Sequence, residues 1–300
     1  MRIQHPYRQR GDFLRSHHRP ELEIAPSVRA PAVAGRFYPA NRAELASLVE
    51  ELLAAARGDA PPPAPFRAVI APHAGYVYSG PTAAAVFARL ELPALVVILA
   101  PNHTGVCNVA GGVSLWEDGA FRTPLGDVPV DARLAAALRA ASPLVGVDHE
   151  AHLGEHAIEV ELPFLQMTRP DARIVPLLLA WDAWEAARAL GETLAELVRV
   201  AAEPVLLLAS SDLNHYEPAA VSEEKDARAL AAVTALDGAE LLKRCRSERI
   251  SMCGRGPAAV VLAAARSLGA QRAEVVDYRH SGWVSGDNTR VVGYAGVVIP

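Results

Sequence analysis

FRAVIAPHAGY at residues 66–76 and LVVILAPNHTG at residues 95–105 share one arrangement, an apolar run that ends at a proline and is followed within two residues by a histidine. Aliphatic and β-branched runs of this length are typical of strands buried on both faces of a parallel sheet. A single histidine after a strand is usually a polar residue that hydrogen-bonds in a turn. Two change that expectation, because the carboxyl ends of neighbouring parallel strands lie along one edge of the sheet, where ligands bind. The sequence therefore predicts that His73 and His103 converge.

Similar apolar runs recur through the rest of the chain and decide the fold class. They are ARIVPLLLA (172–180), PVLLLAS (204–210), AEVVDY (273–278) and RVVGYAGVVI (290–299), mostly separated by Ala-, Leu- and Arg-rich segments of helical length. This alternation predicts an α/β protein with a largely parallel sheet covered on both faces. A helix is expected over residues 42–57, because Asn41 suits an N-cap and Gly58 a stop. GGVSLWEDGAFRTPLGDVPV (111–130) breaks the rhythm and is interpreted as an antiparallel hairpin that turns at EDG.

The chain is expected to form one domain behind an N-terminal extension. No shift in composition within residues 29–300 is sharp enough to mark a second domain. Residues 1–28 are rich in arginine and contain no periodic apolar face that could dock on the domain. We therefore expect this extension to be mobile or only loosely packed.

Composition excludes several classes of function. The chain has 300 residues, 51% of them hydrophobic, and a net charge of −5. No basic block alternates with aromatic residues, which argues against a nucleic-acid partner. Three cysteines, an odd number, favour a reducing cytosol over a disulfide framework. No run approaches the roughly 18 apolar residues of a membrane span, and the extension matches neither a secretory nor a transit signal. We therefore expect a cytoplasmic protein that binds no membrane.

A third strand end and a helix start add chemistry to the predicted edge. SDLNHY (211–216) follows the run PVLLLAS and supplies Asp212 and His215. Cys253 precedes a predicted helix whose first turn contains Pro257. A helix start favours the thiolate, which is both a nucleophile and a metal ligand. Cysteine is otherwise a frequent inert core residue, but this position argues for a functional thiol.

DHEAHLGEHAIEVELPFLQ (148–166) concentrates histidine and glutamate. The segment is close to the H-E-x-x-H motif of the zinc-protease helix, but the second histidine, His152, comes one residue too early. The two histidines would not share a helical face, which excludes a zincin. Gly154 suggests that a helix starts near Glu155 and His156. The acidic residues would then either complement the helix dipole or accompany a supporting role of His156 beside the site.

Other catalytic patterns fit less well. GRGPAA (254–259), with Asp277 about twenty residues on, imitates a dinucleotide-binding motif, but ERISM before it is a poor strand and Pro257 occupies the turn. GWVSG (282–286) misplaces the first glycine of a nucleophile elbow. A cysteine nucleophile, Cys253 activated by His215 or His103, remains an alternative because it uses the same residues.

Six ordered motifs resemble one known family. VAGRFYPAN, IAPHAGYVYSG, APNH, GEHAIEVELPFLQ, SSDLNHY and ERISMCGRGP occur in this order and look like the Memo family, whose prokaryotic members are called AmmeMemoRadiSam system protein B. The resemblance runs from about Arg29 to the C-terminus and leaves only the extension outside.

The resemblance implies a three-layer α/β/α fold related to the class III extradiol dioxygenases, which are non-haem iron enzymes. By similarity, His73, His103 and Cys253 would be the metal ligands, with Cys253 where the dioxygenases have a carboxylate. His215 would match their acid/base histidine, and Asp212 and His156 complete the predicted catalytic group. The cysteine in place of the carboxylate departs from the ligand set of the ring-cleaving dioxygenases.

The resemblance also implies a cofactor and partners. Two imidazoles and a thiolate can hold iron(II), copper or zinc, and iron(II) is the metal expected here. The family name implies association with a radical-SAM protein and an AMMECR-type domain. The ligand is expected to be a small molecule or a peptide, and the resemblance does not identify it. We expect a metal-dependent redox protein or oxidoreductase. The alternatives are a non-catalytic binding module that uses the same pocket and a cysteine-nucleophile enzyme.

Overall fold

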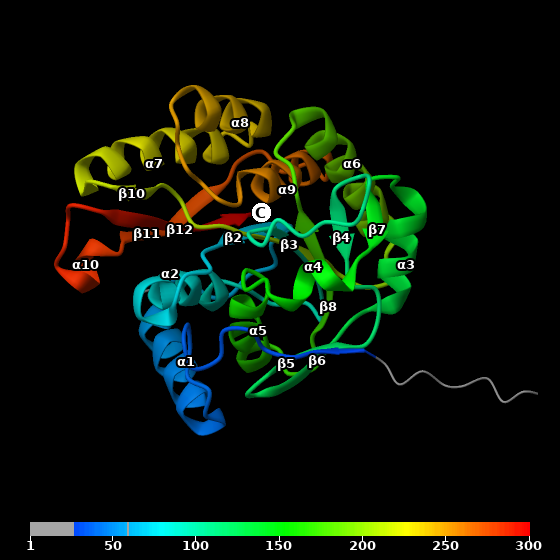
Figure 1. Cartoon of the computed structure of the whole chain (residues 1–300), viewed down its shortest axis with the longest axis horizontal. Coiled ribbons are helices and arrows are strands. Elements are labelled where there is room, and N and C mark those ends of the chain that lie inside the picture. Colours follow the sequence, from blue (N-terminus) through cyan, green and yellow to red (C-terminus); the bar gives the residue numbers. More distant parts are fainter. Residues whose placement is uncertain (1–26, 59) are drawn as a thin grey trace, which may run out of the picture.

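The computed structural model describes residues 27–58 and 60–300 (Figure 1). The strands are β1 (Val28–Arg29), β2 (Ala68–Ala71), β3 (Leu95–Pro101), β4 (Val113–Leu115), β5 (Ala120–Thr123), β6 (Gly126–Pro129), β7 (Val145–Val147), β8 (Arg173–Leu179), β9 (Val205–Ser210), β10 (His215–Glu217), β11 (Glu274–His280) and β12 (Val291–Ile299). The helices are α1 (Arg42–Arg57), α2 (Tyr76–Ala88), α3 (Ala132–Ala141), α4 (His149–Leu153), α5 (Leu162–Thr168), α6 (Trp184–Val200), α7 (Ala219–Thr234), α8 (Gly238–Ser247), α9 (Arg255–Ser267) and α10 (Gly282–Ser285), with a 3-10 turn η1 (Glu159–Glu161).

A nine-stranded sheet forms the centre of the molecule. Its strand order is β10-β12-β2-β9-β3-β8-β4-β7, and β11 pairs with β12. The four middle strands β2, β9, β3 and β8 are parallel, whereas β12 and β4 flank them in the antiparallel sense. The prediction of a largely parallel sheet is confirmed for this middle, where the strands are buried on both faces.

Helices cover both faces of the sheet, which gives three layers. One core contains side chains of α3, α6, α7, α8 and α9, and the other contains side chains of α1, α2 and α5. Successive residues of β3 alternate between them: Val97 and Leu99 belong to the first core, Val96 and Ile98 to the second. Figure 1 shows α6 to α9 above the sheet and α1, α2 and α5 below it. The three-layer α/β/α fold is therefore confirmed.

The predicted α1 helix is confirmed at both ends. The side chain of Asn41 accepts hydrogen bonds from the backbone N–H groups of Ala43 and Glu44, and Gly58 follows the last turn. These contacts satisfy two of the free donors at the helix start, which is why a local sequence signal was enough to locate it.

The predicted hairpin at EDG is wrong. β4 pairs with β7 and β8 of the central sheet, whereas β5 pairs with β1 and β6 in a separate three-stranded sheet. The EDG turn therefore leads from one sheet to the other, and the hairpin is formed by β5 and β6. Gly119 of the turn has φ +78°, and a Cβ there would lie 1.8 Å from the backbone oxygen of Ser27. The close approach of β1 to this turn thus requires glycine.

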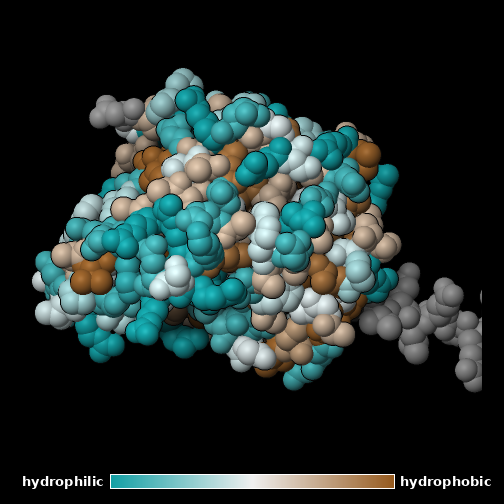
Figure 2. Space-filling view, turned by 90° about the horizontal axis from the view of Figure 1, so that it is seen from above, coloured by the Kyte–Doolittle hydropathy of each residue, from teal (hydrophilic) through white to brown (hydrophobic). Residues whose placement is uncertain are grey.

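The last residue of the predicted extension, Val28, belongs to the small sheet together with Arg29, the first residue of the predicted domain. Val28 and Arg29 pair with Ala120 and Phe121 of β5. Residues 1–26 of the extension lie outside the described residues. Within residues 27–58 and 60–300, no helix is long and apolar enough to cross a membrane. On the face seen in Figure 2, hydrophobic side chains form small separate groups among hydrophilic ones.

Candidate metal centre

The carboxyl ends of three adjacent parallel strands form the candidate site. β2 leads to His73, β3 leads to His103, and β9 leads to Asp212 and His215. Because β9 lies between β2 and β3 in the sheet, the loops that follow the three strands meet at one edge. The structure thus brings the residues predicted from these strand ends together.

Three imidazole rings form a compact cluster at this edge. His73, His103 and His156 can each offer one ligand atom, and these atoms all lie within 4.8 Å of one another. The ring centroids are 5.2 Å apart for His73 and His103, 5.4 Å for His73 and His156, and 4.8 Å for His103 and His156. From its sequence context His156 was expected only in a supporting role, whereas its ring lies among the candidate ligands.

Cys253 adjoins this cluster through His73. Its Sγ lies 3.3 Å from Nε2 of His73 and accepts a hydrogen bond from the backbone N–H of Asp212. Gly254 permits this approach, since a Cβ there would lie 2.4 Å from the backbone oxygen of Ser210. The expectation that the start of α9 lowers the pKa of Cys253 is not met in the metal-free protein. Burial raises that pKa, and the charge of Asp212 raises it further.

The other ring nitrogen of each histidine is already engaged. Nδ1 of His73 lies 2.8 Å from Ser210 Oγ, Nδ1 of His103 lies 2.9 Å from Glu155 Oε1, and Nδ1 of His156 lies 3.3 Å from the same carboxylate oxygen. A partner on Nδ1 fixes the ring orientation and leaves Nε2 as the ligand atom, as in many metal sites. Three imidazoles with fixed Nδ1 partners beside a thiol suit a divalent metal ion, so these residues fit the cofactor that the resemblance implies.

Glu155 organises the segment that carries His156. Its carboxylate accepts hydrogen bonds from the backbone N–H groups of His103, His156 and Ala157 as well as from the His103 ring. Burial alone would raise the pKa of Glu155, but the hydrogen bond and the charge of His103 lower it to about 2. The same pair raises the pKa of His103 against the effect of burial. Glu155 is therefore a permanent anion beside the cluster.

The predicted helix start at Glu155 is wrong. α4 ends before Gly154, and regular structure resumes only at η1. Glu155 and His156 thus lie in an irregular connection, and the carboxylate of Glu155 binds N–H groups at the site instead of complementing a helix dipole. Sequence reasoning missed this role, although glutamates within an otherwise apolar run were a usable signal, because buried carboxylates need partners.

His215 and Asp212 border the cluster. The backbone N–H of His215 donates to Ser251 Oγ, and its Nδ1 lies 3.0 Å from the Ser251 carbonyl oxygen, which leaves Nε2 free. Burial lowers the pKa of His215. Oδ1 of Asp212 accepts from the backbone N–H of His73, and burial raises the pKa of Asp212 to about 7. His215 is thus held as a neutral imidazole.

Two cavities meet at this centre. One of about 460 Å³ is lined by the three clustered histidines, Asp212, His215 and Cys253, with Phe37, Tyr216 and Tyr294 among its other walls. A second of about 410 Å³ shares His103, Ser251 and Cys253 with it. Two cavities on the same pair of candidate ligands leave room for a substrate to approach.

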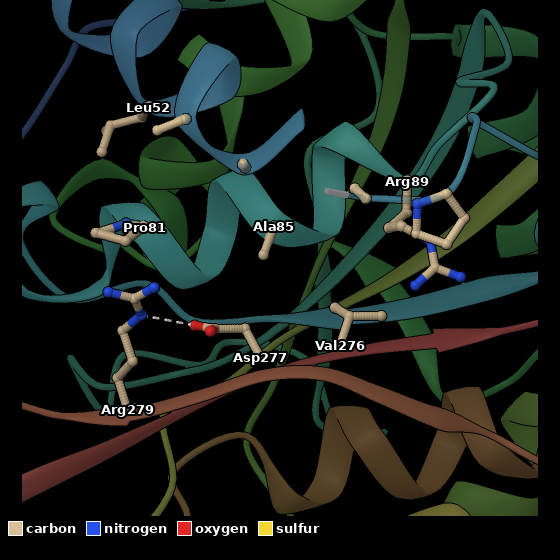
Figure 3. A pocket seen from close by; sticks show the side chains of 11 residues that line it. Leu52, Pro81, Ala85, Arg89, Val276, Asp277 and Arg279 are labelled. Carbon is tan, nitrogen blue, oxygen red and sulfur yellow. Dashed lines mark hydrogen bonds and ion pairs between the residues drawn. The ribbon is translucent and has the colours of Figure 1, made fainter. Parts of the chain in front are cut away.

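A cavity larger than these two lies elsewhere. It has a volume of about 780 Å³ between α1, α2 and β11, and it contains an ion pair between Arg279 and Asp277 (Figure 3). No histidine or cysteine lines it, so its size does not make it the site of the predicted chemistry.

The patterns set aside in the sequence are absent from the site. His149 stacks on Trp116, and the ring of His152 contacts the carbonyl oxygen of Ser114, so neither belongs to the cluster. Residues 248–254, which include ERISM, form no strand before α9, which removes the dinucleotide-binding alternative. Of the two histidines considered as activators of Cys253, neither is the nearest, since His73 contacts the thiol.

Comparison with known proteins gives one family. The sequence model described as Memo-like protein matches residues 29–298. A MEMO1 family protein of Methanopyrus kandleri is 41% identical over 283 residues, which cover 90% of this chain and 98% of that protein. A MEMO1 family protein of Methanothermobacter thermautotrophicus is 39% identical over 276 residues, 89% of this chain and 99% of that protein. The crystal structure of an uncharacterized protein from Escherichia coli K12 is similar in fold, with a TM-score of 0.51 and 16% identity over 79% of this chain and 100% of that one.

Proposed function

The chain belongs to the Memo family, and from this premise and the geometry of its centre we propose that it is a metal-dependent oxidoreductase that binds one divalent ion. The single observation that carries the proposal is the cluster of His73, His103 and His156, whose ligand atoms lie within 4.8 Å of one another. Side chains brought together from three separate segments, with their Nδ1 atoms engaged, match the way proteins prepare a metal site.

The donor set limits the choice of metal. Imidazole suits iron, copper and zinc, and a thiolate shifts the preference toward copper(I), zinc or thiolate-bound iron. We propose iron(II) as the resident ion, with copper or zinc as alternatives. When bound, the ion would activate O₂ or a substrate hydroxyl group as a Lewis acid or redox centre.

His73, His103 and Cys253 are the proposed ligands, and His156 competes with Cys253 for the third position. In the metal-free protein the thiol and the imidazole of His73 are both neutral, because burial raises the pKa of Cys253 and lowers that of His73. A divalent ion supplies the positive charge that favours a thiolate. Cys253 would therefore lose its proton as the ion binds, and metal uptake should release protons.

His215 is the proposed general acid and base. It lines the same cavity as the candidate ligands, its Nδ1 is held by the carbonyl oxygen of Ser251, and its Nε2 is free. Burial lowers its pKa, so the ring is neutral at pH 7 and can accept a proton from a substrate hydroxyl group. Asp212 keeps the His73 loop in position through its hydrogen bond to the backbone.

Metal analysis of anaerobically purified protein and of single variants tests the proposal. We expect about one ion per chain, and affinity at least about 10-fold lower in His73→Ala and His103→Ala, since losing a ligand should cost no less than losing its supporting partner. Comparing His156→Ala with Cys253→Ala identifies the third ligand, and Cys245→Ala, outside the site, is the control. Normal metal binding by folded His73→Ala and His103→Ala variants would refute the proposal. An O₂-uptake screen with phenols and thiols then tests for turnover.

The contact between Cys253 and His73 favours one second candidate, a cysteine nucleophile. That chemistry needs the thiolate, whereas burial raises the thiol pKa. Rapid alkylation of metal-free protein by iodoacetamide at pH 7, lost in Cys253→Ala, would support the nucleophile over the metal ligand.

A further inference from the structure

Three glutamates of the segment 155–161 are buried, yet their surroundings differ. Glu155 accepts four hydrogen bonds at the centre, as described above. Glu159 accepts from the guanidinium of Arg29, the backbone N–H groups of Ala32 and Val33, and the Tyr38 hydroxyl. Among the described residues, Glu161 forms a side-chain hydrogen bond with one partner, Ser210, and its Oε2 has no hydrogen-bond partner. Two of these carboxyl groups therefore lie among donors fit for an anion, and the third does not.

The positions of the protons around Ser210 follow from counting hydrogen-bond donors and acceptors. Ser210 Oγ lies 2.7 Å from the carbonyl oxygen of Ala157, 2.9 Å from Oε1 of Glu161 and 2.8 Å from Nδ1 of His73. A hydroxyl group has one proton and two lone pairs. A carbonyl oxygen can only accept, so the hydroxyl proton is used on Ala157. The other two contacts then need protons from Glu161 and from His73.

We propose that Glu161 is held as a neutral carboxylic acid that donates its proton to Ser210, and that this pair orients His73 with its proton on Nδ1 and its Nε2 toward the centre. Glu161 is thus a positioning residue, because it acts through Ser210 and contacts no reacting atom. The use of Nε2 as a ligand rests on the proposed function, whereas the proton assignment does not.

The neighbours of Glu161 support the neutral form. Burial raises the pKa of Glu161 well above its ordinary value, and the charge of Asp212 adds to it; a hydrogen bond donated by Ser210 would oppose this, but the Ser210 proton is used on Ala157. The hydroxyl group of Tyr76 is also nearby, but it donates to the carbonyl oxygen of Val160. Within residues 27–58 and 60–300, no cation forms an ion pair with Glu161 in the way that Arg29 pairs with Glu159. An ionised Glu161 would be a buried, nearly unpaired charge, which proteins avoid.

Infrared difference spectroscopy of the full-length, metal-free protein at pH 7 tests the protonation directly. The parent should show the C=O stretching band of a protonated carboxylic acid that Glu161→Gln lacks and Glu159→Gln keeps. A difference spectrum without that band would overturn the proposal.

Thermal unfolding of the two variants Glu161→Gln and Glu159→Gln gives an independent test. The amide of Glu161→Gln can donate to Ser210 as the acid does, so its Tm should stay within about 2 °C of the parent. Glu159→Gln leaves Arg29 without its charge partner and should lower Tm by at least about 6 °C. Glu161→Gln unfolding as early as Glu159→Gln, or failing to fold, would show that Glu161 is ionised.

The positioning role is tested on His73 itself. In ¹⁵N NMR spectra of metal-free protein, the proton of His73 should be on Nδ1 in the parent and in Glu161→Gln, but distributed over both nitrogens in Glu161→Leu or, should that variant not fold, in Ser210→Ala. An unchanged tautomer in the folded variant would overturn this role. If the acid band and the tautomer are found but the parent binds no metal, the proposed function fails and the proton assignment stands. If the parent binds metal but lacks the acid band, the proton assignment fails and the proposed function stands.

Discussion

Replacing Arg29 by methionine should destabilise the whole domain, although Arg29 lies near the beginning of the described chain. The guanidinium is fully buried. It donates to the carbonyl oxygens of His152 and Glu155 and forms an ion pair with Glu159. Methionine keeps much of the apolar stem and removes only the charge and the donors. The carboxylate of Glu159 would then be buried without its cation.

The expected loss follows from that unpaired charge. Removing one partner of a buried ion pair typically costs about 3–5 kcal/mol. In a domain of this size, 1 kcal/mol corresponds to a Tm shift of about 2 °C, so Arg29→Met should unfold roughly 6–10 °C below the parent. Arg139→Met is the matched control, since Arg139 pairs with Glu117 at the surface, where the side chain is 49% exposed. A pair of that kind contributes at most about 1 kcal/mol.

Urea unfolding at pH 7, followed by circular dichroism, measures the free energies of unfolding of Arg29→Met and Arg139→Met. The double variant Arg29→Met/Glu159→Gln should recover at least about 1 kcal/mol relative to Arg29→Met, because the unpaired charge is removed. If Arg29→Met were no less stable than Arg139→Met, the ion pair of Arg29 with Glu159 would not stabilise residues 152–159, and the reasoning above would be wrong.

Three further outcomes are expected. His215→Ala should keep its metal and lose metal-dependent turnover, and its pH–rate profile should lack one limb; loss of the metal would instead make His215 a ligand. Burial raises the pKa of Asp226 to about 6. The folded state therefore binds the carboxyl proton of Asp226 more tightly than the unfolded state does. The stability that results is present below about pH 4 and is lost as the pH rises through 6. The free energy of unfolding of Asp226→Asn should therefore rise relative to the parent by about 2 kcal/mol between pH 4 and pH 7, and urea titrations that find the two parallel would contradict the raised pKa. Deleting residues 1–25 should leave metal content unchanged and Tm within about 2 °C, as the sequence of the extension predicts; a drop of several degrees would show that the extension docks on the domain.

Features that depend on local sequence were predictable. The strand ends with His73 and His103 followed from apolar runs next to prolines, and the start of α1 followed from the capping side chain of Asn41. Their convergence needed only the rule that parallel strands end at one edge.

Features that depend on distant partners were not predictable. The turn at EDG leaves the central sheet because Gly119 lies against Ser27, and Glu155 binds His103, 52 residues away in sequence, instead of capping a helix. The place of His156 in the cluster depends on the same contact. The position of Cys253 before α9 suggested a lowered pKa, but burial by the rest of the fold has the larger effect. A pattern within ten residues contains no information on such contacts.

The sequence distances around Arg29 have a consequence for synthesis of the protein. Arg29 binds groups 123 to 130 residues later in the chain. At about 5–20 residues per second, a ribosome takes roughly 6–26 s to make that stretch, so Arg29 leaves the exit tunnel long before its partners. Cys253 follows His73 by 180 residues and appears later still. A nascent chain that ends before Glu159 cannot pair its arginine, and one that ends before Cys253 cannot complete the thiol–imidazole contact, so the centre can form only after translation has passed both points.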